Sequence, residues 1–224
     1  MISADKKYRT TFFRRWISCV LWLIGSGLFF HARAQNIIYS NDELNAWHKG
    51  TVWLASGDSL EGYLRIDYNR ELLEVDMVTS MRALSPRQVY AFVWFDSLRN
   101  APQIFYSLHY AVKRNYKAPL FFEMQLDGRK LSLLSRDKIL SEAVPSRDPY
   151  SGQTHFYTYH RVVQELFVRQ SNGDIILLDK LQSQLSDFFG NDDKRMKEHI
   201  KTHRLRAENL SDLISILLYY NSLD

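Results

Sequence analysis

Cysteine is almost absent from this sequence of 224 residues. Its one cysteine, Cys19, lies near the N-terminus, so the rest of the chain can form no disulfide and offers no thiol as a metal ligand or nucleophile. Long apolar runs are also missing after Phe30, so we expect no later membrane-spanning helix, which takes about 20 apolar residues. The remaining chain of about 190 residues must fold around a hydrophobic core, and this length is enough to bury one.

The sequence also lacks the motifs that hold common cofactors. It contains no glycine-rich phosphate loop, no calcium-binding loop and no cysteine cluster. Acidic residues are frequent, but the sequence assigns no pair of them the roles of general acid and general base. We therefore predict no cofactor, no metal site and no complete catalytic site.

The first 34 residues have the pattern of a secretory signal peptide. Five basic residues precede an apolar run at 16–30, and Ala32-Arg33-Ala34 then supplies the small residues that signal peptidase recognises. The apolar run is 15 residues long, too short to cross a bilayer as a helix. We therefore expect cleavage before Gln35 and export to the periplasm, to the outer membrane as an associated protein, or to the medium.

Charge gives no indication of a nucleic-acid partner. The first 34 residues hold six of the 29 basic and one of the 25 acidic residues, which leaves 23 basic and 24 acidic residues in the remainder. The net charge of +4 therefore comes from the signal segment, and we expect no binding to nucleic acid.

Residues 51–178 have the pattern of an antiparallel sheet. In segments such as 63–67, apolar and polar side chains alternate with a period of two, which is typical of strands with one buried face. Segment 89–95 is apolar on both faces, which predicts a central strand. The pairs Asp127-Gly128 and Asn172-Gly173 lie between apolar runs and predict two hairpins.

The last 45 residues change to a helical period. An apolar stripe predicts a first helix at 181–189, with Asp179 as its N-cap and Gly190 at its end. Two further helices are predicted, one around Met196 and one that begins after Asn209.

Strands followed by helices predict an α+β protein rather than a βαβ alternation. We expect a β-rich domain at 35–178 with a sandwich-like or barrel-like antiparallel sheet. Residues 141–153 contain two prolines, a glycine and several small polar residues, which predicts a loop. A C-terminal helical segment at 179–224 is expected to pack on the sheet, because its apolar stripes would otherwise be exposed.

The tetrapeptide Gly57-Asp58-Ser59-Leu60 matches the motif that names the GDSL esterases, with Ser59 in the place of the nucleophile. That chemistry needs a histidine oriented by a carboxylate and donors for the oxyanion. The family supplies the first two as Asp-x-x-His, a spacing that this sequence lacks. We therefore interpret the tetrapeptide as a turn between two strands, and a serine esterase that uses Ser59 is the alternative.

Two histidines and two tyrosines are weaker candidates. His199 and His203 lie four apart on a predicted helix and could face one metal ion, but no glutamate lies between them and basic residues surround them. We interpret this region as a solvated helix face, with an anion or membrane-surface patch as the alternative. Tyr157 and Tyr159 lie on a predicted strand, where exposed aromatic faces could stack on sugars or pack against a neighbouring strand.

Several short elements are shared with a known group of proteins. They are the Ala34-Gln35 junction, Gly50-x-Val52-x-Leu54, Gly57-Asp58, Gly62, Ser85-Pro86 with Val89 and Phe92, Ile200-Lys201, Asp212-Leu213 and Tyr219-Tyr220-Asn221. With these elements the chain resembles uncharacterised exported proteins from Bacteroidota. The resemblance implies export and the order of strands before helices, and it implies no functional residues.

Export and the lack of a complete catalytic site together favour a non-enzymatic protein that binds a partner or structures the cell envelope. We expect the partner to be an envelope protein or a glycan. An esterase that uses Ser59 and a glycan-binding module that uses Tyr157 and Tyr159 are the alternatives.

Overall fold

The computed structural model describes residues 46–223, except 98, 114–115 and 149. The chain divides between Arg33 and Ala34 into two units, and the described residues all belong to the second. The predicted signal peptide at 1–34 and the polar segment that follows it therefore lie outside the described residues. None of the described helices is long and apolar enough to cross a membrane.

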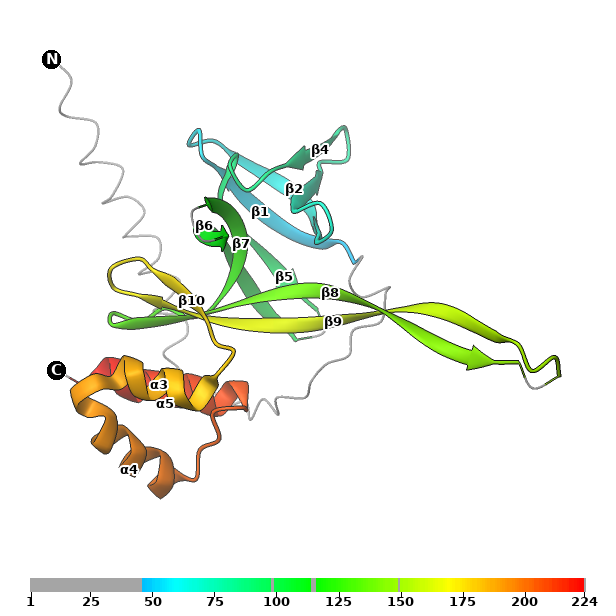
Figure 1. Cartoon of the computed structure of the whole chain (residues 1–224). Coiled ribbons are helices and arrows are strands. Elements are labelled where there is room, and N and C mark those ends of the chain that lie inside the picture. The colour runs from blue at the N-terminus through cyan, green and yellow to red at the C-terminus, as the bar shows by residue number, and fades with distance from the viewer. Residues whose placement is uncertain (1–45, 98, 114–115, 149, 224) are drawn as a thin grey trace, which may run out of the picture. The chain divides into compact units, whose positions relative to one another are not determined.

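Ten strands of the described chain form one antiparallel sheet (Figure 1). They are β1 (His48–Leu54), β2 (Ser59–Asp67), β3 (Leu72–Asp76), β4 (Met81–Leu84), β5 (Val89–Asp96), β6 (Ala101–Lys113), β7 (Tyr116–Leu126), β8 (Leu131–Arg147), β9 (Thr154–Gln170) and β10 (Ile175–Leu177). Their order is β10-β9-β8-β7-β6-β5-β1-β2-β3-β4, so the sheet has two ends. With helices after the strands, this confirms the α+β class and the antiparallel sheet. The sandwich-like or barrel-like form stays a prediction.

β5 is a central strand, as its two apolar faces predict. It pairs with β1 on one side and with β6 on the other. Val89, Phe92 and Trp94 are buried, and the ring of Phe92 stacks on that of Phe105 with centroids 4.6 Å apart. These residues belong to a buried apolar cluster to which strands from β1 to β7 contribute.

The Gly57-Asp58 pair turns the chain between β1 and β2, which confirms the turn predicted there. Gly57 has a φ of 100°, a left-handed conformation that glycine adopts without strain. The backbone N–H of Leu54 donates to the carbonyl of Asp58 at 2.8 Å and closes the turn. Further along β2, a Cβ added at Gly62 would lie 2.3 Å from the carbonyl oxygen of Asp76, so only glycine allows β2 and β3 to approach this closely.

The loop predicted at 141–153 is largely wrong. β8 and β9 pair continuously from Leu131 opposite Gln170 to Arg147 opposite Thr154, so residues 141–147 are strand and only 148–153 form the turn. Pro145 is tolerated in β8 because no other described strand pairs with β8 at this position, and the missing amide can face away from β9. The prolines, glycine and small polar residues of 141–153 predicted a loop. That composition does not reveal the partner strand of equal length that follows the turn.

The helical segment begins directly after β10. It contains α3 (Leu181–Phe189), the 3-10 helix η1 (Gly190–Asp192), α4 (Asp193–His203) and α5 (Leu210–Ser222). The N-cap predicted for α5 is confirmed, since the side chain of Asn209 accepts from the backbone of Ser211 and Asp212 at 2.9 and 3.2 Å.

The N-cap predicted for α3 is wrong. Lys180, not Asp179, occupies the position, and it makes no side-chain cap bond. The side chain of Gln184 instead reaches back and accepts from the backbone N–H of Lys180 at 2.9 Å. This bond satisfies one of the backbone donors that a helix leaves free at its start.

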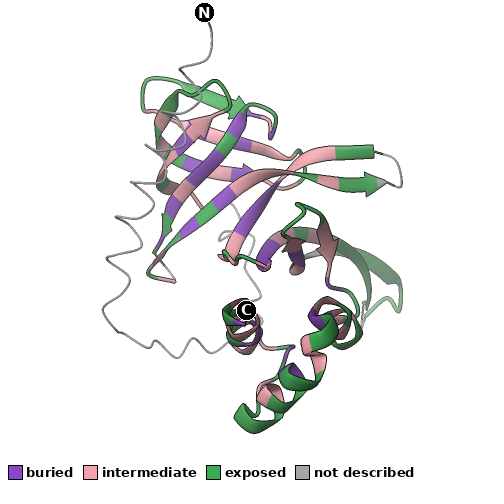
Figure 2. Ribbon diagram, turned by 90° about the vertical axis from the view of Figure 1, so that its left-hand side faces the viewer, coloured by how far each residue is buried: buried purple, intermediate pink, exposed green. Residues whose placement is uncertain are grey.

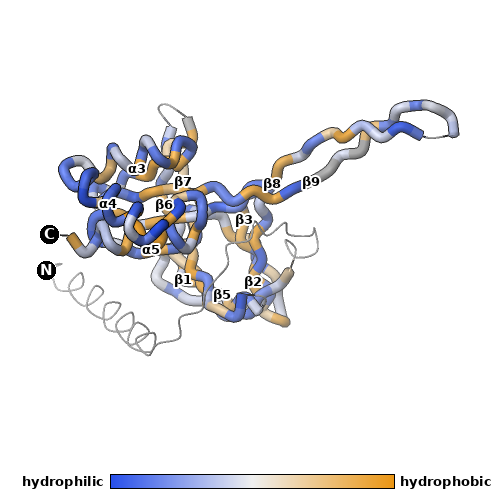
Figure 3. Tube along the Cα trace, turned by 90° about the horizontal axis from the view of Figure 1, so that it is seen from below, coloured by the Kyte–Doolittle hydropathy of each residue, from blue (hydrophilic) through white to orange (hydrophobic). Residues whose placement is uncertain are grey.

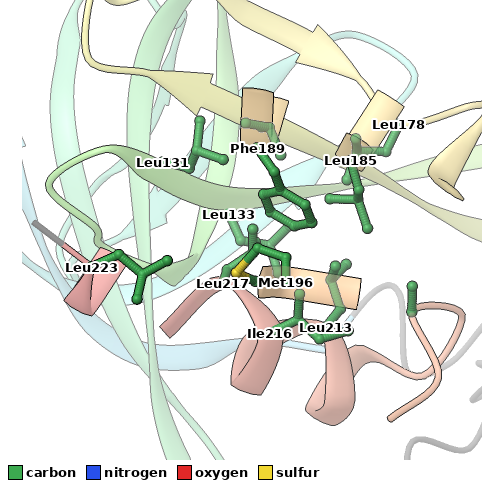
Figure 4. Packing of buried hydrophobic residues seen from close by; sticks show 12 residues of the cluster. Leu131, Leu133, Leu178, Leu185, Phe189, Met196, Leu213, Ile216, Leu217 and Leu223 are labelled. Carbon is green, nitrogen blue, oxygen red and sulfur yellow. The ribbon is translucent and has the colours of Figure 1, made fainter. Parts of the chain in front are cut away.

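The helices pack against β8 and β9 through one apolar cluster (Figure 4). Leu131 and Leu133 of β8 and Val168 of β9 supply its sheet side. The buried residues from the helical side are Leu178, Leu185, Phe189, Met196, Ala207, Leu213, Ile216, Leu217 and Leu223. Burial of these side chains removes the apolar stripes of all three helices from water, the main favourable contribution to holding them on the sheet.

Asn221, at the end of α5, ties the helices to the turn between β7 and β8. Its side-chain oxygen accepts from the backbone N–H of Lys130 at 2.8 Å and of Leu131 at 3.1 Å. Its amide nitrogen donates to the carbonyls of Leu131 and Leu217, both at 2.8 Å. A Cβ added at Gly128 would lie 2.3 Å from that nitrogen, so the turn and the side chain approach as closely as glycine permits.

Replacement of Asn221 tests how much this contact stabilises the fold. We expect Asn221→Ala to lower the free energy of unfolding by roughly 2–4 kcal/mol, because two backbone donors lose their partners at a partly buried site. Urea unfolding measures the change. The exposed Asn191→Ala is the matched control and should change it by no more than about 0.5 kcal/mol. An equal effect of the two variants would contradict a special role for Asn221.

Candidate functional site

Two distant parts of the sheet meet on its inner side. The hydroxyl of Tyr68, in the turn between β2 and β3, lies 3.5 Å from Oδ2 of Asp137 on β8. Arg136 of β8 forms an ion pair with Glu71 of the same turn. β2 and β8 are five steps apart in the strand order, which would separate them by about 24 Å in a flat sheet. The sheet must therefore curl strongly toward β8.

A buried polar network lines the inner side beside this contact. Glu123, only 9% exposed, accepts from the side chain of Gln103 at 2.9 Å and from Arg99 at 3.3 Å. Its other oxygen accepts from the hydroxyl of Ser135 at 3.1 Å. The indole N–H of Trp94 donates to Gln103 at 2.6 Å. The carboxylate of Glu123 is thus hydrogen-bonded and charge-paired, as a buried charge must be.

A small cavity separates this network from the β2–β3 turn. Its lining includes Tyr68, Glu71, Glu123, Ser135 and Asp137. Its volume is about 10 Å³. That is room for about one water molecule. Carboxyl groups beside a cavity, here Glu71, Glu123 and Asp137, are a common feature of acid–base catalysis, but a substrate needs far more space than this. We therefore regard the network as a structural link inside the curled sheet.

Asp137 is the most perturbed group of this link. Burial raises the pKa of Asp137 to about 6, and the negative charge of Glu123 is the second cause. Arg99, Tyr68 and Gln164 act in the opposite direction. Burial also raises the pKa of Glu71, which the charge of Arg136 partly offsets. The folded protein therefore binds a proton at Asp137 more tightly than the unfolded chain does.

This raised pKa predicts how stability changes with pH. The stabilisation from proton binding at Asp137 is complete below about pH 4 and is lost as the pH rises through about 6. The loss amounts to at most roughly 3 kcal/mol, from about two pKa units. Asn cannot ionise and can still accept from Tyr68, so Asp137→Asn should gain stability relative to the unmodified protein as the pH rises from 4 to 7.

Urea unfolding of both proteins across this pH range measures the difference. The exposed Asp187→Asn is the matched control. A difference for Asp137→Asn that stays constant from pH 4 to 7 would contradict the raised pKa.

Ser59, the candidate nucleophile, is an exposed residue at the start of β2. It pairs with Trp53 across the hairpin. His48, on the same hairpin, pairs with Leu64 at the far end and stacks on Trp94 with ring centroids 4.8 Å apart. No described histidine forms a hydrogen bond with Ser59. Within the described residues, the structure does not assemble the neighbours that a serine nucleophile needs.

The outer half of the β8–β9 hairpin projects beyond the other strands (Figure 1). We call residues 141–160 the arm. Among the described residues, β8 pairs with β7 only at residues 133–135 and β9 pairs with β10 only at 167–169, so no described strand continues the sheet beyond either side of the arm. Residues 141–147 are all exposed, and Phe156 and Tyr150 are 71% and 98% exposed. The free edges offer backbone donors and acceptors to another strand.

Tyr157 and Tyr159, the candidate glycan-binding residues, both belong to the arm. Their backbones lie in β9 opposite Val144 and Glu142, and their side chains lie outside the described part of the structure. The prediction of a glycan site at these tyrosines is therefore untested.

His199 and His203 lie side by side on α4. Their ring centroids are 4.2 Å apart, and the ring of His199 stacks on Tyr219 of α5 at 3.7 Å. Nδ1 of His203 bonds to the backbone carbonyl of His199 at 2.9 Å. Burial lowers the pKa of His199, and the charge of His203 lowers it further. The described residues contain no group of three or more His, Cys, Asp or Glu side chains that could hold a metal ion.

No pattern in the sequence indicates the inner network. Glu123, Ser135 and Asp137 are ordinary polar residues of strands, and only the strand register places Glu123 opposite Ser135. Tyr68 lies in a turn, and a tyrosine in a turn does not by itself indicate a contact with a distant strand. No local spacing could have identified these four residues as neighbours.

Comparison with protein-family models, with curated proteins and with solved structures finds no match for this chain. The function therefore has to be argued from the geometry of the chain itself.

Proposed function

We propose that this chain is an exported, non-enzymatic protein of the cell envelope that binds a partner protein through the arm. The observation that carries the proposal is the arm itself, a long two-stranded extension with exposed side chains and free edges. Export is supported by the signal-like pattern at 1–34 and by the resemblance to exported proteins of Bacteroidota.

The arm contributes little to the stability of the fold. Two-stranded hairpins are only marginally stable in water, and the side chains at 141–147 are exposed. Two ion pairs across the hairpin help to hold its strands, Arg161 with Glu142 at 2.8 Å and Lys138 with Glu165 at 3.2 Å. A shorter hairpin would fold as well, so a contact outside this chain is the better reason for the arm.

The two edges of the arm differ in how well they can accept another strand. The β8 edge carries Pro145 between Glu142 and Arg147, and proline and charged residues are common means of blocking an exposed edge. The β9 edge at 154–160 has no proline and no Asp, Glu, Lys or Arg. Strand addition, in which a partner's extended segment pairs with an exposed edge, therefore fits β9.

We also propose that the curled sheet is sandwich-like. Support comes from the contacts of the β2–β3 turn with β8, and from the apolar cluster that strands of both halves share. In a sandwich-like sheet the inner network would close one side, and the arm would extend from its margin.

Shortening the arm tests the proposed function. In this variant, the two residues Asn-Gly replace 141–160 and link Leu140 to Arg161. We expect its free energy of unfolding to stay within about 1 kcal/mol of that of the intact protein, because the arm buries little of its surface. In cells that export the protein, a photo-reactive residue at Phe156 should cross-link to a discrete partner protein. An excess of the intact protein should compete for that partner, and an excess of the shortened variant should not.

A photo-reactive residue at Tyr116 is the matched control, since this aromatic residue is also exposed, at 54%, and lies outside the arm. Equal cross-linking from both positions, or competition by the shortened variant, would contradict the proposal. Binding to a glycan array that Tyr157→Ala and Tyr159→Ala abolish would favour the glycan-binding alternative instead.

Ester hydrolysis separates the proposal from the esterase alternative. We expect the exported protein and its Ser59→Ala variant to hydrolyse a nitrophenyl ester at the same low rate, because Ser59 is an exposed residue without a described histidine partner. Turnover above the uncatalysed rate that disappears in Ser59→Ala would refute the non-enzymatic function.

A further inference from the structure

α4 presents a stripe of lysines to solvent. Lys194, Lys197 and Lys201 are all exposed, and their spacing of three and four residues places them on one face of the helix. Met196, fully buried, faces the core and anchors the helix. Figure 2 shows α4 mostly in the colour of exposed residues, and Figure 3 shows it mostly in that of hydrophilic residues.

Two further basic residues follow the lysines at the end of the helix. Arg204 ends α4 in a left-handed conformation with a φ of 53°, and both Arg204 and Arg206 are exposed. We call Lys194, Lys197, Lys201, Arg204 and Arg206 the basic stripe.

Acidic side chains near the basic stripe offset only part of its charge. Asp193 forms an ion pair with Lys197 at 2.6 Å, and Asp212 accepts from the backbone of Arg206. Glu198 is the one acidic residue in segment 194–206, against six basic residues. Arg195 is directed elsewhere, since it donates to the hydroxyl of Tyr219 at 3.2 Å.

Charge is strongly segregated along the chain. Residues 35–224 hold 23 basic and 24 acidic side chains, and segment 194–206 takes six of the former and one of the latter. The other residues of 35–224 therefore hold 17 basic and 23 acidic side chains. Segment 194–206 therefore carries a net charge of +5 and the other residues of 35–224 a net charge of −6, with the histidines neutral. Such a separation orients the molecule toward an anionic surface.

We propose that α4 binds the phosphate groups of an anionic phospholipid surface through the basic stripe. Clusters of four to eight Lys and Arg residues on a helix bind such surfaces. The exposed residues of α4 are Lys194, Arg195, Lys197, Glu198, Lys201, Thr202 and His203, none of them apolar. A protein partner would need an apolar centre to its interface, so this face suits lipid head groups better. The interaction does not involve the arm and is independent of the proposed function.

Vesicle binding tests this inference. The probes are vesicles of phosphatidylcholine with or without phosphatidylglycerol, sedimented with the protein as the cell exports it. We expect binding only with phosphatidylglycerol, and weakening as salt is added, because screening shortens the reach of surface charges. Lys194→Gln, Lys197→Gln and Lys201→Gln together should weaken binding at least tenfold, since each lysine contributes about fivefold.

Arg70→Gln, Arg82→Gln and Arg87→Gln together are the matched control, because these arginines are exposed and lie outside α4. The control and the arm-shortened variant should bind as the unmodified protein does. No binding to either vesicle, or an equal loss in the control triple variant, would overturn the proposal. Displacement by inorganic phosphate that exceeds the effect of chloride at equal ionic strength would identify a site for a soluble anion, and equally strong binding to polyglutamate would identify a site for an acidic protein. Either result would also overturn it.

Discussion

The position of the helices on the sheet depends on the side chain of Asn221. The turn between β7 and β8 leaves the backbone N–H groups of Lys130 and Leu131 to be satisfied, and Asn221 accepts from both. An apolar cluster can hold helices on a sheet but does not specify their position along it, because burial of apolar surface is not directional. Hydrogen bonds are directional. Asn221 therefore sets where α5 lies, and Gly128 permits the close approach that this position requires.

β8 connects this attachment to the rest of the molecule. Its first residues, Leu131 and Leu133, lie under the helices, its middle residues Ser135 and Asp137 contact the inner network, and its last residues form one strand of the arm. These three regions follow one another along a single strand. The helices therefore pack on the same strand that continues into the arm.

Features set by neighbours in the sequence could be predicted from it. The turn at Gly57, the N-cap at Asn209 and the central position of β5 each depend on a few adjacent residues, and all three were correct. The remaining features have different causes. Strand 141–147 requires β9, a partner that follows it along the chain, whereas the start of α3 uses the nearby side chain of Gln184 in place of Asp179. The four-residue strand β4 was not predicted because it has little pattern of its own. The inner network could not be predicted because Asp137 and Tyr68 are distant in the sequence and meet only in the curled sheet.

Two parts of the fold add little to its core, and they differ in chemistry. The arm is long and close to neutral and exposes backbone edges, which suits recognition by another strand. α4 has one fully buried residue and a strongly basic outer face, which suits phosphate groups and gives little shape specificity. A weak, salt-sensitive contact with a surface raises the local concentration of a protein near partners in that surface, and the second contact then forms more readily. Specificity would therefore come from the arm, and α4 would determine where the arm is presented.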